Sequence, residues 1–532
     1  MTRFLEHYRA WITPLSPVHI GTGEDYEPTN FVVHDGALWA FDPLHLPFNG
    51  QLRNRLRKIV EGEDVVAAIA ATHLFFANSF SPQVIHRTSR YRVPVCDGFV
   101  ANCEEAKKKW HDLQRKGATL NFDVIKTVNV ARMMRDPLRF HPYLPGTSVK
   151  GALRGLVLRS LARWKGRTVL YETKPPEKVE EKFRKLENDL LERGERAHLA
   201  WDPLRLLGVS DFHPTRAHAG DAGHVVFRVR MYRKPELKKG KKKDIIVSEG
   251  VEVVLPGKLR PFEGAILLRD LDGHPVPGRR RNDLPKSLFA PKLEDLVGTA
   301  NRLAKRVLTQ ERNSLTVNTH VNPKWFDAAL ELLDALEPHN DDGSRGHRAF
   351  LLRLGQGSGA RYLSLGDPGT KTLSVAGLTA HPDRAALPFG WVLVELAPEG
   401  EEPSAFPELE AFCERWSKWA GSATEGAPSR SGSRPEAEPA TRAEIDVEIP
   451  DSRNAALLRA VRGQIASQLP ERYHALLSNL VKQARNWSPE ERSLLVRLVE
   501  EHVRPKLGDR AEKDHRWKQI LQQVAKLNSR SG

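Results

Sequence analysis

The stretch Tyr143–Arg154 (YLPGTSVKGALR) constrains the fold more than any other part of the chain. An apolar pair ends at Pro145-Gly146, and Thr147 or Ser148 can then cap a helix that we expect to run to about Trp164. The start of such a helix presents unpaired backbone N–H groups and the positive end of the helix dipole to an anion. The pattern therefore predicts either an anion-binding helix start or an ordinary capped helix with solvated cations.

The same helix carries a basic face. Lys150 and Arg154 are four residues apart, so both side chains lie on one side of the helix. Gly151 and Gly155 have no Cβ and leave the backbone open to close approach. These features suit a phosphate ligand, although a solvated basic surface has the same pattern.

The charge balance favours a polyanionic partner. The 532 residues include 82 Lys and Arg against 67 Asp and Glu, a net charge of +15. Nucleic acid is the commonest partner of so basic a protein. No apolar run approaches the roughly 20 residues of a membrane helix, and the first residues contain no apolar signal segment. We therefore expect a cytoplasmic protein with no membrane partner.

The cysteines and histidines indicate neither a disulfide framework nor a metal site. The three cysteines, Cys96, Cys103 and Cys413, are too few and too widely spaced for either, so we expect small core residues. The 20 histidines show no spacing typical of metal ligands, and no cofactor is predicted. A metal-independent ribonuclease would need one or two histidines, such as His19 or His141, as acid and base.

Strand and helix patterns alternate through the first 400 residues. We expect a strand over Tyr8–Ile20 that ends in a glycine turn at Gly21–Gly23, and a hairpin over Phe31–Phe41 with its turn at His34–Gly36. Two similar-sized stretches, 1–225 and 226–400, predict an α+β fold of two domains. Each would be a small antiparallel sheet with helices on one face.

Further elements follow from the same patterns. We expect helices at Leu44–Val60 and Val307–Leu336, a turn and buried strand at Asp202–Asp211, and strands at His224–Tyr232, Val251–Leu255, Leu351–Leu354 and Leu387–Leu396. Residues 417–449 are rich in Ser, Gly, Pro, Ala and Glu and predict a flexible linker. Apolar stripes at helical spacing, with a capping box at Ser488–Glu491, predict an α-helical bundle over 450–530.

A glycine-rich loop, Gly355–Gly359, follows one of the expected strands. It lacks the Lys-Ser/Thr pair of a P-loop and the spacing of a dinucleotide fingerprint. Such a loop can still let a phosphate backbone lie against protein N–H groups, with Arg361 and Lys371 to neutralise it. A tight β-turn is the alternative.

Three motifs thus stand in order: TPLSPVHIGTG at residues 13–23, LPGTSVKGALR at 144–154, and LGQGSG at 354–359, followed by Lys371-Thr372. This order resembles the RAMP superfamily of CRISPR proteins, and most closely the fifth subunit of the Csm effector complex of type III-A systems. The segments at 24–30 and 202–211 are also similar to that family.

The resemblance implies two RRM-like, ferredoxin-like domains with insertions and a non-catalytic subunit that caps the effector filament at the 3′ part of the crRNA and assists crRNA maturation. Its partners would be crRNA, the backbone RAMP subunit, the small subunit and the large polymerase-like subunit, with target RNA reached indirectly. The resemblance implies that Gly146, Ser148, Lys150 and Arg154 hold crRNA phosphates, and that Gly21, Gly23, Gly355, Gly357 and Gly359 shape the same groove. The residues themselves add further candidate RNA contacts at His19, Arg87, Arg90, Arg361 and Lys371.

Two alternatives stay open. One is a RAMP endoribonuclease that processes the CRISPR transcript, and the other is the equivalent end subunit of a type III-B complex. The region after Gly400 lies outside the resemblance. The basic segments Lys238–Lys243 and Gly278–Arg281 are unusual insertions, either extra RNA contacts or plain loops.

Overall fold

A computed structural model gives the fold of the chain in two compact units, residues 1–428 and 429–532, which we describe separately. The structure describes residues 5–27, 29–62, 65–115, 129–166, 184–192, 202–218, 224–233, 247–269, 271, 292–315, 321–342, 347–355, 372–377, 386–422, 477, 481, 484, 487–504 and 515–528. Among the described helices, none combines the length and apolar character that a membrane crossing needs.

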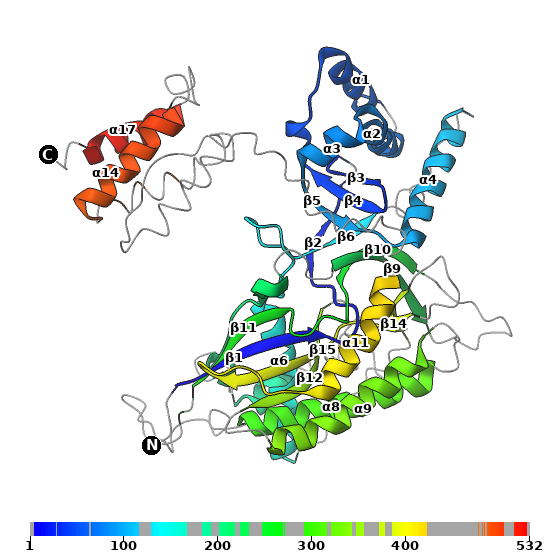
Figure 1. The fold of residues 1–532 in the computed structure, drawn as a ribbon, viewed down its shortest axis with the longest axis vertical. Coiled ribbons are helices and arrows are strands. Elements are labelled where there is room, and N and C mark those ends of the chain that lie inside the picture. Colours follow the sequence, from blue (N-terminus) through cyan, green and yellow to red (C-terminus); the bar gives the residue numbers. More distant parts are fainter. Residues whose placement is uncertain are drawn as a thin grey trace. The chain divides into compact units, whose positions relative to one another are not determined.

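The first sheet, sheet A, is antiparallel and is built around the N-terminal strand (Figure 1). Its order is β12 (Arg348–Arg353), β15 (Trp391–Pro398), β1 (Leu5–Pro14), β11 (Phe262–Arg269) and β7 (Leu207–Val209), and β8 (His213–Pro214) also pairs with β11. Strand β1 ends at Pro14 rather than continuing to Ile20 as predicted. A proline donates no hydrogen bond to a sheet, and Pro17 follows closely.

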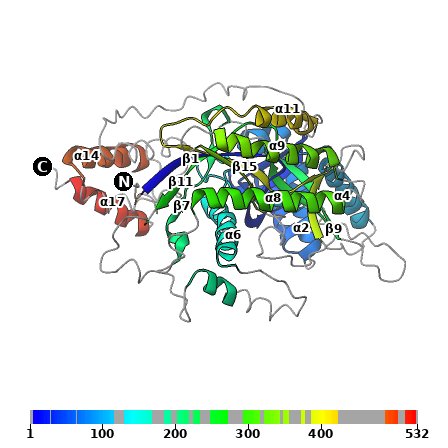
Figure 2. The ribbon, with the colours of Figure 1, turned by 90° about the horizontal axis from the view of Figure 1, so that it is seen from below.

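Four helices share one apolar core with this sheet: α6 (Gly146–Trp164), α8 (Leu293–Leu315), α9 (Pro323–Asp342) and α11 (Pro407–Ser422). Seen from below, α8 and α9 run side by side across the unit (Figure 2). Phe412 and Trp416 of α11 belong to this core, which therefore extends beyond residue 400. Helix α11 continues to Ser422, within the predicted linker. The observed extent of α6 confirms the helix predicted after Pro145-Gly146.

The second sheet, sheet B, has the order β14 (Leu387–Pro388), β13 (Thr372–Gly377), β9 (His224–Arg233), β10 (Val247–Val254), β6 (Val130–Met133) and β2 (Gly21–Asp25). Only β10 and β6 run parallel. Both sheets take strands from either side of residue 225, so the packing does not divide where the two predicted domains meet. The fold combines helices with largely antiparallel sheets. This agrees with the predicted α+β class.

The predicted glycine turn at Gly21–Gly23 is wrong, because these residues form strand β2 at the edge of sheet B. Only Gly21 and Asp25 pair in register with β6, with an irregularity between them. Gly23 has a φ of +82°, which glycine adopts without strain. The glycines therefore permit a bulged strand where the sequence predicts a turn.

An N-terminal lobe (residues 29–115) carries a third sheet of β3 (Phe31–His34), β4 (Ala37–Phe41) and β5 (Ser89–Pro94). Its helices are α1 (Gly50–Val60), α2 (Val65–Ser79), α3 (Pro82–Thr88) and α4 (Asp97–Arg115). The predicted hairpin turn is confirmed, since Asp35 and Gly36 both have positive φ, at 48° and 66°. Short 3₁₀ helices lie at Pro43–His45, Pro203–Arg205 and Arg216–His218.

The C-terminal unit is helical where it is described, with α14 (Pro489–Leu498), a π-helical turn η9 (Val499–Val503) and α17 (His515–Asn528). The predicted capping box is confirmed: Ser488 and Glu491 each accept a hydrogen bond from the other's backbone N–H. Leu495, Trp517 and Ile520 share its core. Most of the predicted linker and the first apolar stripe lie outside the described residues.

All three cysteines are buried, as predicted for core residues. Burial raises the pKa of the Cys103 and Cys413 thiols to about 12, so both stay protonated near neutral pH.

Candidate nucleic-acid interface

The start of α6 is occupied by a side chain of the same protein. Its N-cap is Pro145, with no side-chain cap hydrogen bond, so the prediction of Thr147 or Ser148 as N-cap is wrong. The backbone N–H of Gly146 donates to Asp211 Oδ1 at 2.8 Å. A carboxylate is stabilised at the positive end of a helix dipole, and this one takes the place expected for an external anion.

Gly146 is needed for this arrangement. A Cβ there would lie 2.4 Å from the backbone O of Ser210, so only glycine lets the helix start pack against the segment between β7 and β8. At Gly151, by contrast, an added Cβ meets nothing within 4 Å. The two glycines of one motif therefore have different roles, the first in packing and the second facing open space.

Lys150 and Arg154 share a face of α6, as predicted, but both contact the protein. Lys150 Nζ donates to the backbone O of Leu207 at 2.6 Å. Arg154 forms an ion pair with Glu187, in the helix at 184–190, and keeps 38% of its side chain exposed. A phosphate at this face would have to share or replace these partners.

The first and last glycine motifs meet at His19. A Cβ on Gly21 would lie 2.8 Å from His19 Nε2, and a Cβ on Gly355 would lie 2.0 Å from the His19 backbone O. Gly355 also has a φ of +73°, which favours glycine. The structure thus brings together three predicted site residues from distant parts of the sequence.

His19 is buried and neutral. Its Nδ1 lies 2.7 Å from the backbone O of Glu252, and because a carbonyl only accepts, Nδ1 carries the proton. Burial lowers the pKa of His19 to about 4, against the opposing charge of Asp25. Burial also lowers the pKa of His141. His19 therefore lacks the near-neutral pKa that favours general acid–base catalysis.

Glu252 connects several segments around His19, and the sequence analysis does not predict this role. It is fully buried in β10, where its Oε2 accepts hydrogen bonds from Tyr26 Oη and from the Met133 backbone N–H, each at 3.0 Å. Its other carboxylate oxygen pairs with buried Arg135, whose guanidinium lies 4.2 Å from the ring centroid of Tyr91. The sequence does contain a signal for this role. Glu252 stands between Val251 and Val253 in an apolar strand, and a carboxylate buried there needs polar partners.

The other predicted contacts are dispersed. Gly23 faces open space, and Arg87 is exposed on α3. Arg90 is exposed but forms an ion pair with Asp42. Gly357, Gly359, Arg361 and Lys371 lie outside the described residues, as do the basic segments Lys238–Lys243 and Gly278–Arg281.

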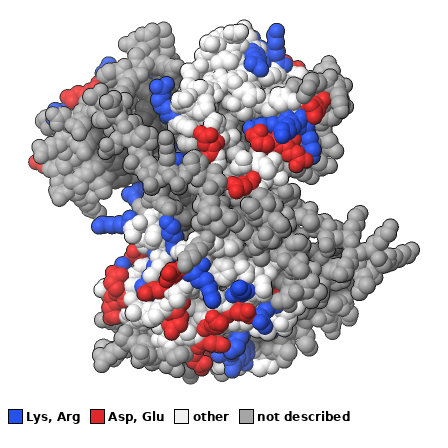
Figure 3. All heavy atoms as spheres, turned by 45° about the vertical axis from the view of Figure 1, so that its right-hand side comes forward, with Lys and Arg blue, Asp and Glu red and all other residues white. Residues whose placement is uncertain are grey.

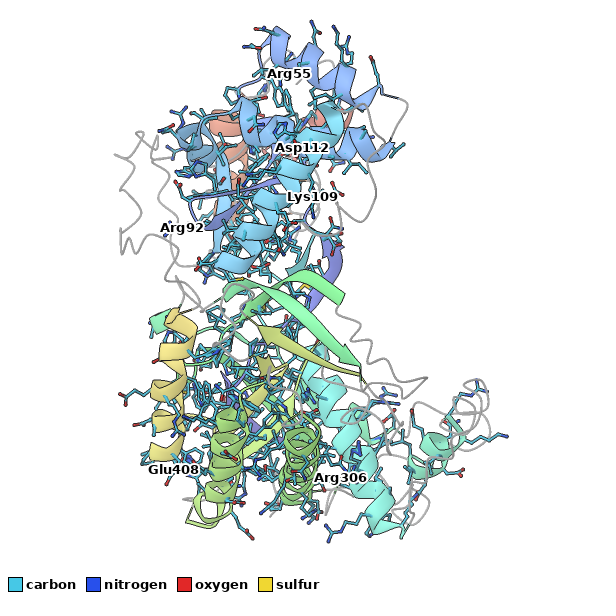
Figure 4. All side chains as sticks on the ribbon, turned by 90° about the vertical axis from the view of Figure 1, so that its right-hand side faces the viewer. Arg55, Arg92, Lys109, Asp112, Arg306 and Glu408 are labelled. Atoms are coloured by element: carbon cyan, nitrogen blue, oxygen red, sulfur yellow. The ribbon has the colours of Figure 1, made fainter. Side chains whose placement is uncertain are left out.

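Helix α1 of the N-terminal lobe is exposed and basic. It has no acidic residue, and its cations Arg53, Arg55, Arg57 and Lys58 form no ion pair with a residue that the structure describes. Figure 4 labels Arg55 on α1 and Arg92 on the same lobe. On the face in Figure 3, basic and acidic side chains are interspersed rather than separated.

The RAMP superfamily model matches residues 11–360. The chain belongs to the RAMP superfamily. This confirms the resemblance at the superfamily level. The matched range includes the start of α6 and the residues His19, Gly21 and Gly355. No curated protein sequence matches the chain.

Two solved structures are similar to parts of this RAMP protein. One is a chain of a Csm–crRNA–target RNA ternary complex of a type III-A CRISPR-Cas system, with 18% identity, 73% of this chain and 100% of that chain covered, and a TM-score of 0.39. The other is Csm5 from T. onnurineus, with 16% identity, coverages of 72% and 99%, and a TM-score of 0.41.

Proposed function

We propose that this RAMP protein is the crRNA-binding end subunit of a type III-A Csm effector complex. It would hold the 3′ part of the crRNA, contact the backbone RAMP subunit and aid crRNA maturation. The large polymerase-like subunit and the small subunit would be partners through the complex, and target RNA would be reached indirectly.

The meeting of Gly21 and Gly355 at His19 carries the proposal. It joins the first and last RAMP motifs in one place, where both glycines pack closely against His19, so that an RNA backbone bound at one motif would also lie near the other. The net charge of +15 and the exposed cations of α1 supply the attraction for phosphate. We further propose that sheets A and B represent the two ferredoxin-like RAMP domains, and that the C-terminal helices form the predicted bundle.

The proposal includes no catalysis by this chain. His19 is 2% exposed and its pKa is lowered to about 4, so it is a poor acid or base for RNA cleavage near neutral pH. Labelled repeat RNA incubated with the purified chain and EDTA should stay intact. Site-specific cleavage that is lost in a His19→Gln variant would instead establish the nuclease alternative.

Native mass spectrometry of the tagged chain from its own cells, with RNA extracted from the same sample, tests the proposal. We expect other RAMP subunits and short RNAs that share a repeat-derived 5′ tag. A chain that purifies alone, or without RNA, would refute the end-subunit role. Type III-B partners in place of Csm subunits would retain the role and change the complex.

A further inference from the structure

Two histidines and an aspartate of the N-terminal lobe lie together although they are far apart in the sequence. His34 ends strand β3, Asp35 is the first residue of the hairpin turn, and His86 lies on α3. One ring nitrogen of each histidine and a carboxylate oxygen of Asp35 all lie within 4.8 Å of one another. Within the described part of the chain, this is the group of three such residues whose spacing suits a metal ion.

The two histidine rings at this site face few polar partners. His86 Nε2 is buried and makes no hydrogen bond to a residue that the structure describes. His34 Nδ1 lies 2.9 Å from Asp35 Oδ1, close enough for both atoms to bind one ion. A buried imidazole nitrogen without a partner is uncommon, because its lone pair or proton loses its contact with water. A shared cation would satisfy both rings.

Trp39 orients both histidines. The ring of His86 stacks on the Trp39 ring with centroids 3.8 Å apart. Trp39 Nε1 donates to the backbone O of His34 at 3.1 Å. The turn itself is rigid, since Asp35 is held at a φ of 48° and the Gly36 backbone O accepts from the Val95 N–H at 2.8 Å. Positioning of ligands by surrounding contacts is typical of metal sites.

We propose that His34, Asp35 and His86 bind one Zn²⁺ ion, with solvent as the fourth ligand. Two imidazoles and one carboxylate favour zinc over Mg²⁺ and Ca²⁺, which prefer oxygen ligands. Tetrahedral zinc with bonds of about 2.0–2.2 Å separates its ligands by roughly 3.3 Å. The widest of the present separations, at most 4.8 Å, would have to close by up to about 1.5 Å on binding. Their partial exposure, 38% for His34 and 57% for Asp35, gives the ion access.

A bound Zn²⁺ ion would connect the β3–β4 hairpin to α3, the helix that carries the exposed Arg87. The zinc site does not depend on the proposed crRNA-binding function, and it is tested without RNA.

Zinc titration of the full chain, purified without a histidine tag, tests the site. A competing chromophoric chelator measures affinity, and the visible absorption of bound Co²⁺ reports tetrahedral coordination. We expect one tight equivalent per chain. His34→Gln and His86→Gln should each weaken binding by more than about 100-fold, since loss of a contact behind a ligand alone costs about 10- to 100-fold.

Asp35→Asn is a second variant that should fold normally, because asparagine tolerates the positive φ of the turn. It removes only the carboxylate charge. It should keep the metal-free melting temperature of the wild type and still weaken Zn²⁺ binding. His45→Gln, at an exposed histidine of the same lobe, is the control and should bind as the wild type does. Unchanged affinity in both His34→Gln and His86→Gln, or an equal loss in His45→Gln, would overturn the proposal.

Discussion

The Asp211 carboxylate accepts a hydrogen bond from the Gly146 N–H at 2.8 Å, and so occupies the positive end of α6. This contact stabilises the helix start and also repels a phosphate that approaches it. Asp211 would therefore favour folding and oppose the proposed RNA binding at the start of α6.

Asp211→Ala separates the two effects. Loss of a capping contact should lower the free energy of unfolding by about 1 kcal/mol. Removal of the negative charge should strengthen RNA binding if phosphate reaches the helix start. Urea unfolding and fluorescence anisotropy with repeat-derived RNA measure the two quantities. Weaker RNA binding by a folded Asp211→Ala protein would contradict an RNA contact there.

Lys150→Ala combined with Arg154→Ala should reduce crRNA retention, because two cations leave one face of α6. Both side chains also hold the fold, so a matched variant is needed. Glu187→Gln releases Arg154 from its ion pair and keeps both cations. It should retain RNA at least as well as the wild type. Tight assembly of the double variant with full-length crRNA would show that this face does not bind RNA.

Gly355→Ala should destabilise the protein and reduce RNA retention. Its Cβ would lie 2.0 Å from the His19 backbone O, at a φ that L-residues rarely adopt. We expect a loss of at least about 1–3 kcal/mol in thermal or urea unfolding. Gly151→Ala, in open space within α6, is the control and should stabilise by about 0.5–1 kcal/mol. Equal stability of the two variants would contradict the close packing at His19.

Arg53→Ala with Arg55→Ala should weaken RNA binding and flatten its salt dependence. The slope of log affinity against log salt should fall by about 0.7 for each lost phosphate contact. Arg306→Ala with Lys324→Ala removes two exposed cations from α8 and α9 and serves as the control. The measurement is RNA affinity over a series of salt concentrations. If log affinity against log salt has the same slope in both double variants, α1 is not part of the interface.

Stability should decrease as the pH falls from about 6.5 to about 4, in part through His19. The folded-state pKa of about 4 lies below the unfolded value of 6.5, so the unfolded chain binds the proton first. The contribution is about 3 kcal/mol at most, and it is complete above pH 6.5. Urea unfolding at pH 7 and pH 4.5 should show a smaller pH dependence in His19→Gln than in the wild type. The same pH dependence in both proteins would mean that His19 titrates normally.

Local chemistry explains which elements the sequence predicts well. The Asp35-Gly36 turn and the Ser488–Glu491 capping box depend on neighbouring residues, so both are predicted correctly. The errors come from distant partners. The N-cap of α6 was misplaced because Asp211 caps the helix from another segment, and β2 was missed because its pairing with β6 overrides its glycines.

The same distinction holds for the candidate site. The motif at α6 is visible in the sequence, but the contacts of Lys150 and Arg154 with Leu207 and Glu187 are not. The network around Glu252 depends on four segments that no local pattern connects. The order of the motifs still points to the superfamily, because motifs that are far apart in the sequence pack together in the fold, as Gly21 and Gly355 do at His19.

Strand β1 pairs on one side with β15, whose last residues precede Glu399. During synthesis, the first strand therefore stays without this neighbour until about three quarters of the chain has left the ribosome. Such non-local pairing makes folding slow and leaves an open strand edge exposed for that time. In the cell, the yield of this protein should thus depend on chaperones that protect the nascent N-terminal strand.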